Sequence, residues 1–220
     1  MIELFQFLNQ GGLIMWLIGA CSLVAGFIFC ERLLLVHRSH IATGDFLKGM
    51  FTILRRGNIV EAISICEETA GPVPHIVRAA VLHYDDDRDT IRQAIEEAGL
   101  AEVPRLERNM NLLLTVAQTT PLLGLLGTVI GLMQALQIIQ SKAPLVHSGD
   151  LSGGLWLALL TTAAGLTVAI PTYAGYNFLV GRVQSLVLDM ERASGEILNF
   201  LIQQQGQTRE ESRETAGSPV

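Results

Sequence analysis

The stretch that decides the fold runs from Gln118 to Pro171. It reads QTTPLLGLLGTVIGLMQALQ over residues 118–137 and LSGGLWLALLTTAAGLTVAIP over residues 151–171, with the polar interval SKAPLVHSGD between the two runs. Both runs lack charged side chains, and both place threonine and glycine where a lipid-facing helix would carry leucine. We interpret the stretch as two membrane-spanning helices that fold back on each other.

Uncharged segments set the predicted number of spans. They cover residues 13–30, 109–141 and 151–181, and a bilayer core needs roughly 20 apolar residues per helix. The chain of 220 residues is 50% hydrophobic and 16% charged, and its mean hydropathy is +0.40, which is too apolar for an ordinary soluble domain. The sequence therefore predicts an all-α integral membrane protein with three transmembrane helices and long cytoplasmic helical extensions.

Positive charge sets the predicted orientation. Lys and Arg side chains follow the first uncharged segment and precede the second, which places the N-terminus outside and the segment between them in the cytoplasm. The residues before the first segment include Glu3 and no Lys or Arg, so we interpret that segment as a retained span and not a signal peptide. The predicted parts are an outer N-terminus (1–12), a first span (13–36), a cytoplasmic helical segment (37–108), a second span (109–140), an outer loop (141–151), a third span (152–181), a cytoplasmic amphipathic helix (182–205) and a disordered tail (206–220).

The cytoplasmic segment is predicted to be helical. Asn58 and Glu61 have the spacing of a capping box at a helix start, and the Gly-Pro pair that begins at Gly71 is a typical helix stop. Further helices are expected over about 74–84 and 89–108. The three aspartates between them are interpreted as a solvated turn, because neighbouring carboxylates on a short turn point apart and do not converge on a cation.

Composition and motifs argue against several classes of function. The net charge is -6 and Lys and Arg do not cluster, which argues against nucleic acid as a partner. Cys21, Cys30 and Cys66 share no motif spacing, so neither a disulfide framework nor a metal site is expected. The sequence holds no nucleophile elbow and no Gly-rich phosphate loop. We therefore predict no catalytic residue, no metal, no cofactor and no enzymatic activity.

The two runs also predict a register for the hairpin. If its turn is centred near Leu145, Thr128 lies level with Thr162 and Pro121 lies nearly level with Pro171. This register gives a hydroxyl layer in mid-membrane and a proline layer nearer the cytoplasm. Both prolines are expected to kink their helices.

Small residues surround both threonines at helical spacing, and two interpretations follow. The residues can pack the two helices closely, with the hydroxyls bonded back to their own helices. Alternatively, this face lines a pore or receives a helix from another protein, because polar groups within a membrane commonly mark ion pathways. The predicted face comprises Gly124, Gly127, Gly131, Ala135, Ala158, Gly165 and Ala169.

The sequence resembles a known family, the ExbB/TolQ/MotA proton-channel subunits of ion-driven motors. Three pieces carry the resemblance, in the family's order and spacing: GGLIMWLIGACSLVAGFIFCERLLLV, TTPLLGLLGTVIGLM and GGLWLALLTTAAGLTVAIPTYAGYN. The similarity covers roughly residues 11–200. Three spans with a short outer N-terminus resemble the ExbB/TolQ branch, because the MotA-type subunits have four spans.

The resemblance implies a location, an assembly and a site. Such subunits lie in the lipid of the bacterial inner membrane, with a periplasmic N-terminus and a cytoplasmic C-terminus. They form homo-pentamers around two single-span subunits of the ExbD/TolR type, whose transmembrane aspartate carries the proton. The motor energises a TonB- or TolA-like transducer that spans the periplasm. The threonines that match Thr128 and Thr162 line the ion path, and we add the adjacent Thr161 to this predicted lining.

One position departs from the family pattern. Family members often carry glutamate five residues before the second threonine, where this chain has Leu157. This position favours one alternative to motor-driven outer-membrane uptake, a scaffold that conducts no ion. A second alternative, a motor of the Tol type that maintains the envelope, differs in its partner and also stays open.

Overall fold

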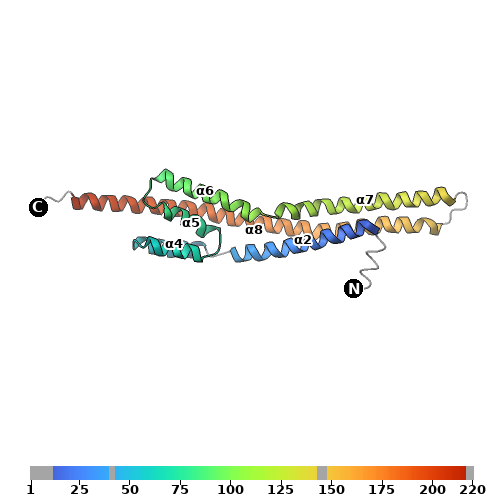
Figure 1. The fold of residues 1–220 in the computed structure, drawn as a ribbon, viewed down its shortest axis with the longest axis horizontal. Helices are drawn as coiled ribbons and strands as arrows, with labels where there is room; N and C mark the ends of the chain where they lie inside the picture. Colours follow the sequence, from blue (N-terminus) through green and yellow to red (C-terminus); the bar gives the residue numbers. More distant parts are fainter. Residues whose placement is uncertain (1–11, 40–42, 143–147, 217–220) are drawn as a thin grey trace. The chain divides into compact units, whose positions relative to one another are not determined.

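The computed structural model describes residues 12–39, 43–142 and 148–216, and these residues form helices without any strand. Three of the helices are long and apolar enough to cross a membrane, which confirms the predicted all-α membrane fold. Figure 1 shows the helices in chain order. They are α2 (Gly12–Ser39), α3 (Thr43–Arg55), α4 (Ile59–Glu68), α5 (Pro72–Leu82), α6 (Arg88–Glu107), α7 (Met110–Lys142) and α8 (Ser148–Ala216).

The chain divides into two compact units. The first, which we call the spanning unit, holds the described residues of 1–33 together with 109–180. The second, which we call the helical bundle, holds the described residues of 34–108 together with those of 181–220. Helix α8 contributes its first part to the spanning unit and its second part to the helical bundle.

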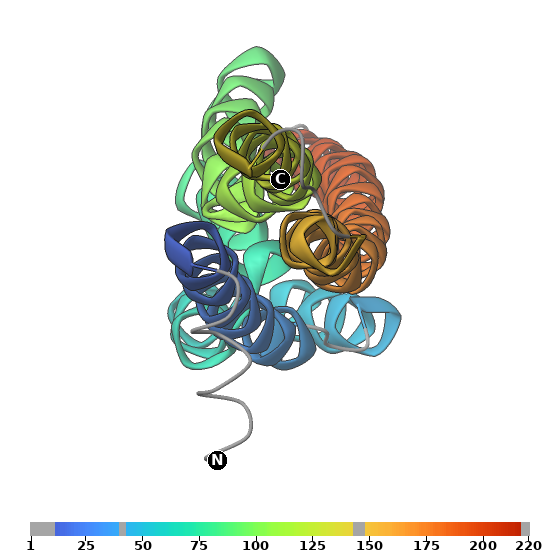
Figure 2. The same cartoon turned by 90° about the vertical axis from the view of Figure 1, so that its right-hand side faces the viewer.

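The spanning unit is built from α2, α7 and the first part of α8. Figure 2 shows these three helices nearly end on. Helices α7 and α8 run antiparallel, because Gly131 lies against Gly154 while Gly124, further from the turn, lies against Gly165. Most of the large side chains on these helices point outward, as in a helix that meets lipid. In the middle of the contact between α7 and α8, the residues that face the neighbouring helix are small.

The helical bundle has a core of large apolar side chains. Helices α3 to α6 and the second part of α8 all contribute to it. The α8 contribution recurs every three or four residues, so one stripe of that helix faces the core. Phe51 stacks on Phe200 with ring centroids 4.5 Å apart. The fully buried members include Met50, Leu54, Ile76, Val77, Ala80, Ile91, Ala193, Ile197 and Leu201.

Two glutamines of α8 bind backbone carbonyls at the ends of the bundle's shorter helices. The Gln204 side chain donates to the carbonyl of Leu54 in the last turn of α3, at 2.9 Å. The Gln205 side chain donates to the carbonyls of Tyr84 and Asp86 in the turn after α5. These bonds connect the second part of α8 to the end of α3 and to the turn after α5.

Two local predictions differ from the structure. Asn58 precedes α4 as expected, but its side chain donates to the Glu61 carboxylate at 2.6 Å and makes no bond to the backbone of the first turn. The sequence predicts a disordered tail over 206–220, whereas the structure continues α8 through residues 206–216. This segment is rich in Glu, Arg, Gln and Ala, which are good helix formers, and it extends a helix that already exists. Residues 217–220 lie outside the described residues.

Burial sets the chemistry of the cysteine in the bundle. Cys66 is 3% exposed, and burial raises the pKa of its thiol to about 11 against the opposing charge of Arg78. We expect an alkylating reagent at pH 8 to modify Cys66 about a hundredfold more slowly in the folded chain than in urea, because the thiolate is the reactive form. Peptide mass spectrometry over a series of pH values measures this rate. The folded rate should keep rising up to about pH 11, whereas a plateau near pH 8.5 would contradict the raised pKa.

Candidate functional site

The backbones of α7 and α8 approach closely in the middle of the spanning unit. A Cβ atom added to Gly131 would lie 2.6 Å from the carbonyl oxygen of Gly154. One added to Gly165 would lie 2.9 Å from the carbonyl oxygen of Thr120. These neighbours are backbone atoms, which cannot rotate away as a side chain can. Glycine at these positions therefore allows the helices to reach a separation that no other residue permits.

Thr161 fills the space that Gly127 leaves. Its side chain has no exposed surface, and a Cβ atom on Gly127 would lie 2.5 Å from the Cβ of Thr161. The Thr161 hydroxyl donates to the carbonyls of Leu157 and Ala158 in its own helix, each at 3.0 Å. Within one chain, Thr161 is thus a packing residue between two helices.

The fit between Gly127 and Thr161 can be tested by exchanging their sizes. Gly127→Ala should destabilise the folded chain by about 1–3 kcal/mol, because the added methyl overpacks the contact. Adding Thr161→Gly to the Gly127→Ala variant should restore part of that loss, less about 1 kcal/mol for glycine within a helix. Thermal unfolding in detergent measures both variants. Gly153→Ala is the matched control because a Cβ there meets open space, and a double variant no more stable than Gly127→Ala would contradict the contact.

The observed pairing of the helices differs from the predicted register. The hairpin is antiparallel as expected, and its closest contacts, Gly127 with Thr161 and Gly154 with Ala135, lie one to two residues from the predicted register. The offset is about 2–3 Å along the axis. The predicted proline layer is offset as well, because Gly124 meets Gly165 and Pro171 therefore lies about three residues beyond the position opposite Pro121. Both α7 and α8 continue through their prolines.

The threonine hydroxyls of the spanning unit differ in how firmly they are bound. Most donate to a carbonyl of their own helix at 2.6–3.0 Å, as seen for Thr115, Thr119, Thr120, Thr128, Thr161, Thr167 and Thr172. The Thr162 hydroxyl lies 3.2 Å from the carbonyl oxygen of Ala158 in its own helix and 3.3 Å from that of Gly124 in α7. Among the described threonines of this unit, Thr162 is the one whose hydroxyl is shared between two helices.

The predicted residues occupy two kinds of position. Thr128 and Thr162 are partly exposed beside the contact between α7 and α8. The Thr128 hydroxyl donates to the carbonyl of Leu125 at 2.6 Å, so it is more tightly held than that of Thr162. Leu157 is also partly exposed. The small residues of the predicted face are all buried, namely Gly124, Gly127, Gly131, Ala135, Ala158, Gly165 and Ala169.

Two residues of the contact were missed from the sequence. Thr120 is fully buried and donates to the carbonyl of Val116 at 2.6 Å. Gly154 lies so close to α7 that an added Cβ would be 2.9 Å from the Cβ of Ala135. Helical spacing carried the signal for both, because Thr120 precedes Gly124 by four residues and Gly154 precedes Ala158 by four.

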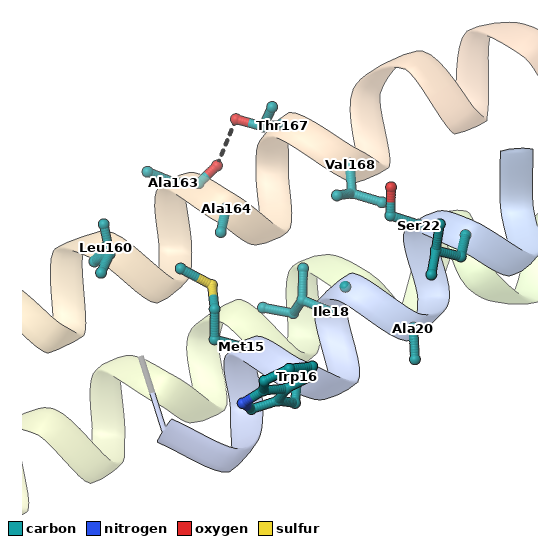
Figure 3. Close-up of a pocket in the computed structure, with 12 residues that line it drawn as sticks. Met15, Trp16, Ile18, Ala20, Ser22, Leu160, Ala163, Ala164, Thr167 and Val168 are labelled. Carbon is teal, nitrogen blue, oxygen red and sulfur yellow. Dashed lines mark hydrogen bonds between the residues drawn. The ribbon is translucent and has the colours of Figure 1, made fainter. Parts of the chain in front are cut away.

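A separate apolar groove lies between α2 and α8. It encloses about 640 Å³. Its lining in Figure 3 includes Met15, Ile18 and Leu160, with Ser22 and Thr167 as its hydroxyl-bearing residues. The Thr167 hydroxyl donates to the carbonyl of Ala163 at 2.8 Å (Figure 3). The groove therefore presents hydrocarbon, in contrast to the loosely held hydroxyl of Thr162.

Comparisons with known proteins point to one family. Residues 68–192 match the sequence pattern of the MotA/TolQ/ExbB proton channel family. A putative biopolymer transport protein ExbB homolog of Methanothermobacter thermautotrophicus is 26% identical over 86% of the chain. The biopolymer transport protein ExbB of Aquifex aeolicus is 44% identical over 41% of the chain. The Tol-Pal system protein TolQ of Haemophilus influenzae is 36% identical over 47% of the chain.

The relatives are longer than the part matched here. The chain spans 66% of the Methanothermobacter protein, 61% of the Aquifex protein and 45% of the Haemophilus protein. The segment of this chain that matches the family, residues 68–192, contains the contact between α7 and α8.

Proposed function

The chain belongs to the MotA/TolQ/ExbB proton channel family, and from this premise we propose that it is the channel subunit of a motor driven by the proton-motive force in the bacterial inner membrane. The observation that carries the proposal is the Thr162 hydroxyl, which is shared between two helices by long hydrogen bonds. It lies within a span and is partly exposed. We propose that Thr128 and Thr162 line the ion path and that Thr161 supports it from the packed face.

The physical basis of the proposal is that a threonine hydroxyl can donate either to a backbone carbonyl or to a carboxylate. A hydrogen bond to an ionised carboxylate is shorter and about twice as strong as one to a neutral carbonyl. A hydroxyl already bound at 2.6 Å, such as that of Thr128, gives up a strong bond when it changes partner. The Thr162 hydroxyl gives up only bonds of 3.2 and 3.3 Å. It is therefore the better donor for a carboxylate that passes through ionised and neutral states.

The titrating acid belongs to another chain in this proposal. No carboxyl or basic side chain occurs in 12–30, 110–141 or 151–181, and Leu157 occupies the position where family members often carry glutamate. We infer that the chain assembles as a homo-pentamer around two single-span ExbD/TolR-like subunits whose membrane aspartate carries the proton. One charge that crosses 100 mV releases about 2.3 kcal/mol, so several protons supply the work of one step.

Orientation and cargo complete the proposal. The bias of Lys and Arg places the N-terminus in the periplasm and both the helical bundle and the C-terminus in the cytoplasm. The motor would then energise a TonB-like transducer for outer-membrane uptake. The similarity to a TolQ protein favours a second candidate, a TolA-like transducer that maintains the envelope. Deleting the gene separates the two, because the first predicts loss of uptake with intact envelopes and the second predicts leaky envelopes.

Purification of the assembled complex tests the motor against the scaffold. The full chain is expressed with the single-span protein encoded beside it, and native mass spectrometry gives the composition. We expect five copies of the chain with two copies of a protein that has one aspartate in its span. A homo-oligomer that binds no acidic single-span protein would favour the scaffold and contradict the proposed motor.

A further inference from the structure

The carbonyl of Gly124 is the acceptor that α7 offers to Thr162. We propose that Gly124 is a positioning residue of the ion path, because its carbonyl holds the Thr162 hydroxyl at rest and releases it to a passing carboxylate. The inference rests on the proposed function, since the carboxylate belongs to the single-span partner. It adds a role for a residue that has no side chain, so a search for polar groups along the path would overlook it.

The geometry around Gly124 shows why no larger residue can replace it without cost. An added Cβ would lie 3.1 Å from the carbonyl oxygen of Thr161 and 3.2 Å from the Cα of Thr162. Both neighbours are backbone atoms of α8, so alanine at 124 must push the helices apart by a few tenths of an ångström. The bond from Thr162 to Gly124 is already 3.3 Å long, and a contact of about 3.6 Å is no longer a hydrogen bond.

Loss of that bond has a defined consequence for the carboxylate. In the wild-type chain, the Thr162 hydroxyl must leave Gly124 before it can donate to the carboxylate. With alanine at 124, the Thr162 hydroxyl has no hydrogen bond to α7 that it must break. Its donation to the ionised carboxylate therefore becomes more favourable. The ionised form is then stabilised, and the pH of half-maximal transport should fall. The packed segments 12–30, 110–141 and 151–181 hold no carboxyl or basic side chain, so no other charge on these segments competes for the hydroxyl.

The hydrogen bond itself is tested in the full chain without its partner. Solid-state NMR of bilayer samples with carbonyl-13C glycine and 15N leucine selects the Gly-Leu pairs, among them Gly124-Leu125 and Gly131-Leu132. Thr162→Val should move the Gly124 carbonyl signal upfield, and Thr162→Ser should leave it in place. The Gly131 signal serves as the internal reference. An unmoved Gly124 signal in Thr162→Val would overturn the proposal.

The role in transport is tested with Gly124→Ala in the complete complex. We expect the pH of half-maximal transport to fall by about half a unit, which corresponds to the loss of one weak hydrogen bond. Gly153→Ala is the matched control, because a Cβ there has no neighbour within 4 Å, and it should leave that pH unchanged. A slower rate at every pH with an unmoved midpoint would mean that Gly124 only packs, and would overturn the positioning role. A wild-type complex with no proton-driven transport would instead reject the proposed function, while the carbonyl signal would still decide the hydrogen bond.

Discussion

Replacing Thr162 by valine is expected to abolish proton-driven transport while the oligomer still assembles. Valine keeps the shape of threonine but removes the hydroxyl, so in the proposed pathway the ionised carboxylate of the single-span subunit loses its donor. Assembly should persist, because the bonds that Thr162 makes to Ala158 and Gly124 are long and valine leaves the backbone contact between residue 162 and Gly124 unchanged. The measurement is transport in cells that depend on this chain, together with native mass spectrometry of the purified complex.

Two controls separate the hydroxyl from its surroundings. Thr162→Ser retains the donor and should preserve most of the transport. Thr167→Val removes a hydroxyl that is bound at 2.8 Å within its own helix and lines the apolar groove, and it should transport normally. Transport at the wild-type rate in Thr162→Val would reject Thr162 as part of the ion path.

Replacing Gly165 by leucine is expected to disrupt the hairpin and the assembly built on it. A Cβ at this position already lies 2.9 Å from the carbonyl oxygen of Thr120 and 3.1 Å from the Cα of Gly124. The remaining atoms of leucine have no space between two backbones, so the helices must separate along the whole contact. Native mass spectrometry should show loss of the oligomer.

The control for this prediction is leucine at an open glycine of the same helix. Gly153→Leu introduces the same side chain where an added Cβ meets nothing within 4 Å, and it should leave α7 and α8 in contact. An unchanged oligomer in Gly165→Leu would show that the close approach of the two backbones is dispensable.

The spans were predictable from the sequence because charged side chains are costly in a bilayer. A span therefore appears as a long segment without Asp, Glu, Lys or Arg. The uncharged segments 13–30, 109–141 and 151–181 lie within α2, α7 and α8 apart from Asn109. Helical spacing likewise predicted that the small residues buried between α7 and α8 share one face. Both signals depend on composition and period, which a single sequence states directly.

The exact pairing was not predictable, because it depends on the fit of individual side chains. Thr161 and Thr162 are neighbours in sequence, yet a helix turns them about 100° apart. One is wedged fully buried against Gly127 and the other is partly exposed. A turn position chosen from the sequence cannot resolve that difference, since a shift of one to two residues keeps the same small-residue pattern. The long bonds of Thr162 could only be found in the structure.

The tail and the ion path mark two further limits. Polarity suggested disorder for 206–216, but helix propensity and the preceding helix favour the continuation of α8 that the structure has. For the ion path, spacing alone left packing and pore lining equally open. The family resemblance singled out Thr128 and Thr162, and the loosely held hydroxyl now gives a physical reason to rank Thr162 first.

The most direct measurement is proton flux into proteoliposomes under an imposed membrane potential. The vesicles contain the chain alone, the chain with its single-span partner, or the partner with the Thr162→Val variant, and an internal pH dye reports the flux. Our account predicts flux only for the wild-type chain with its partner. Equal flux from the chain alone, or from the Thr162→Val complex, would contradict a pathway that is lined by Thr162 and titrated by another subunit.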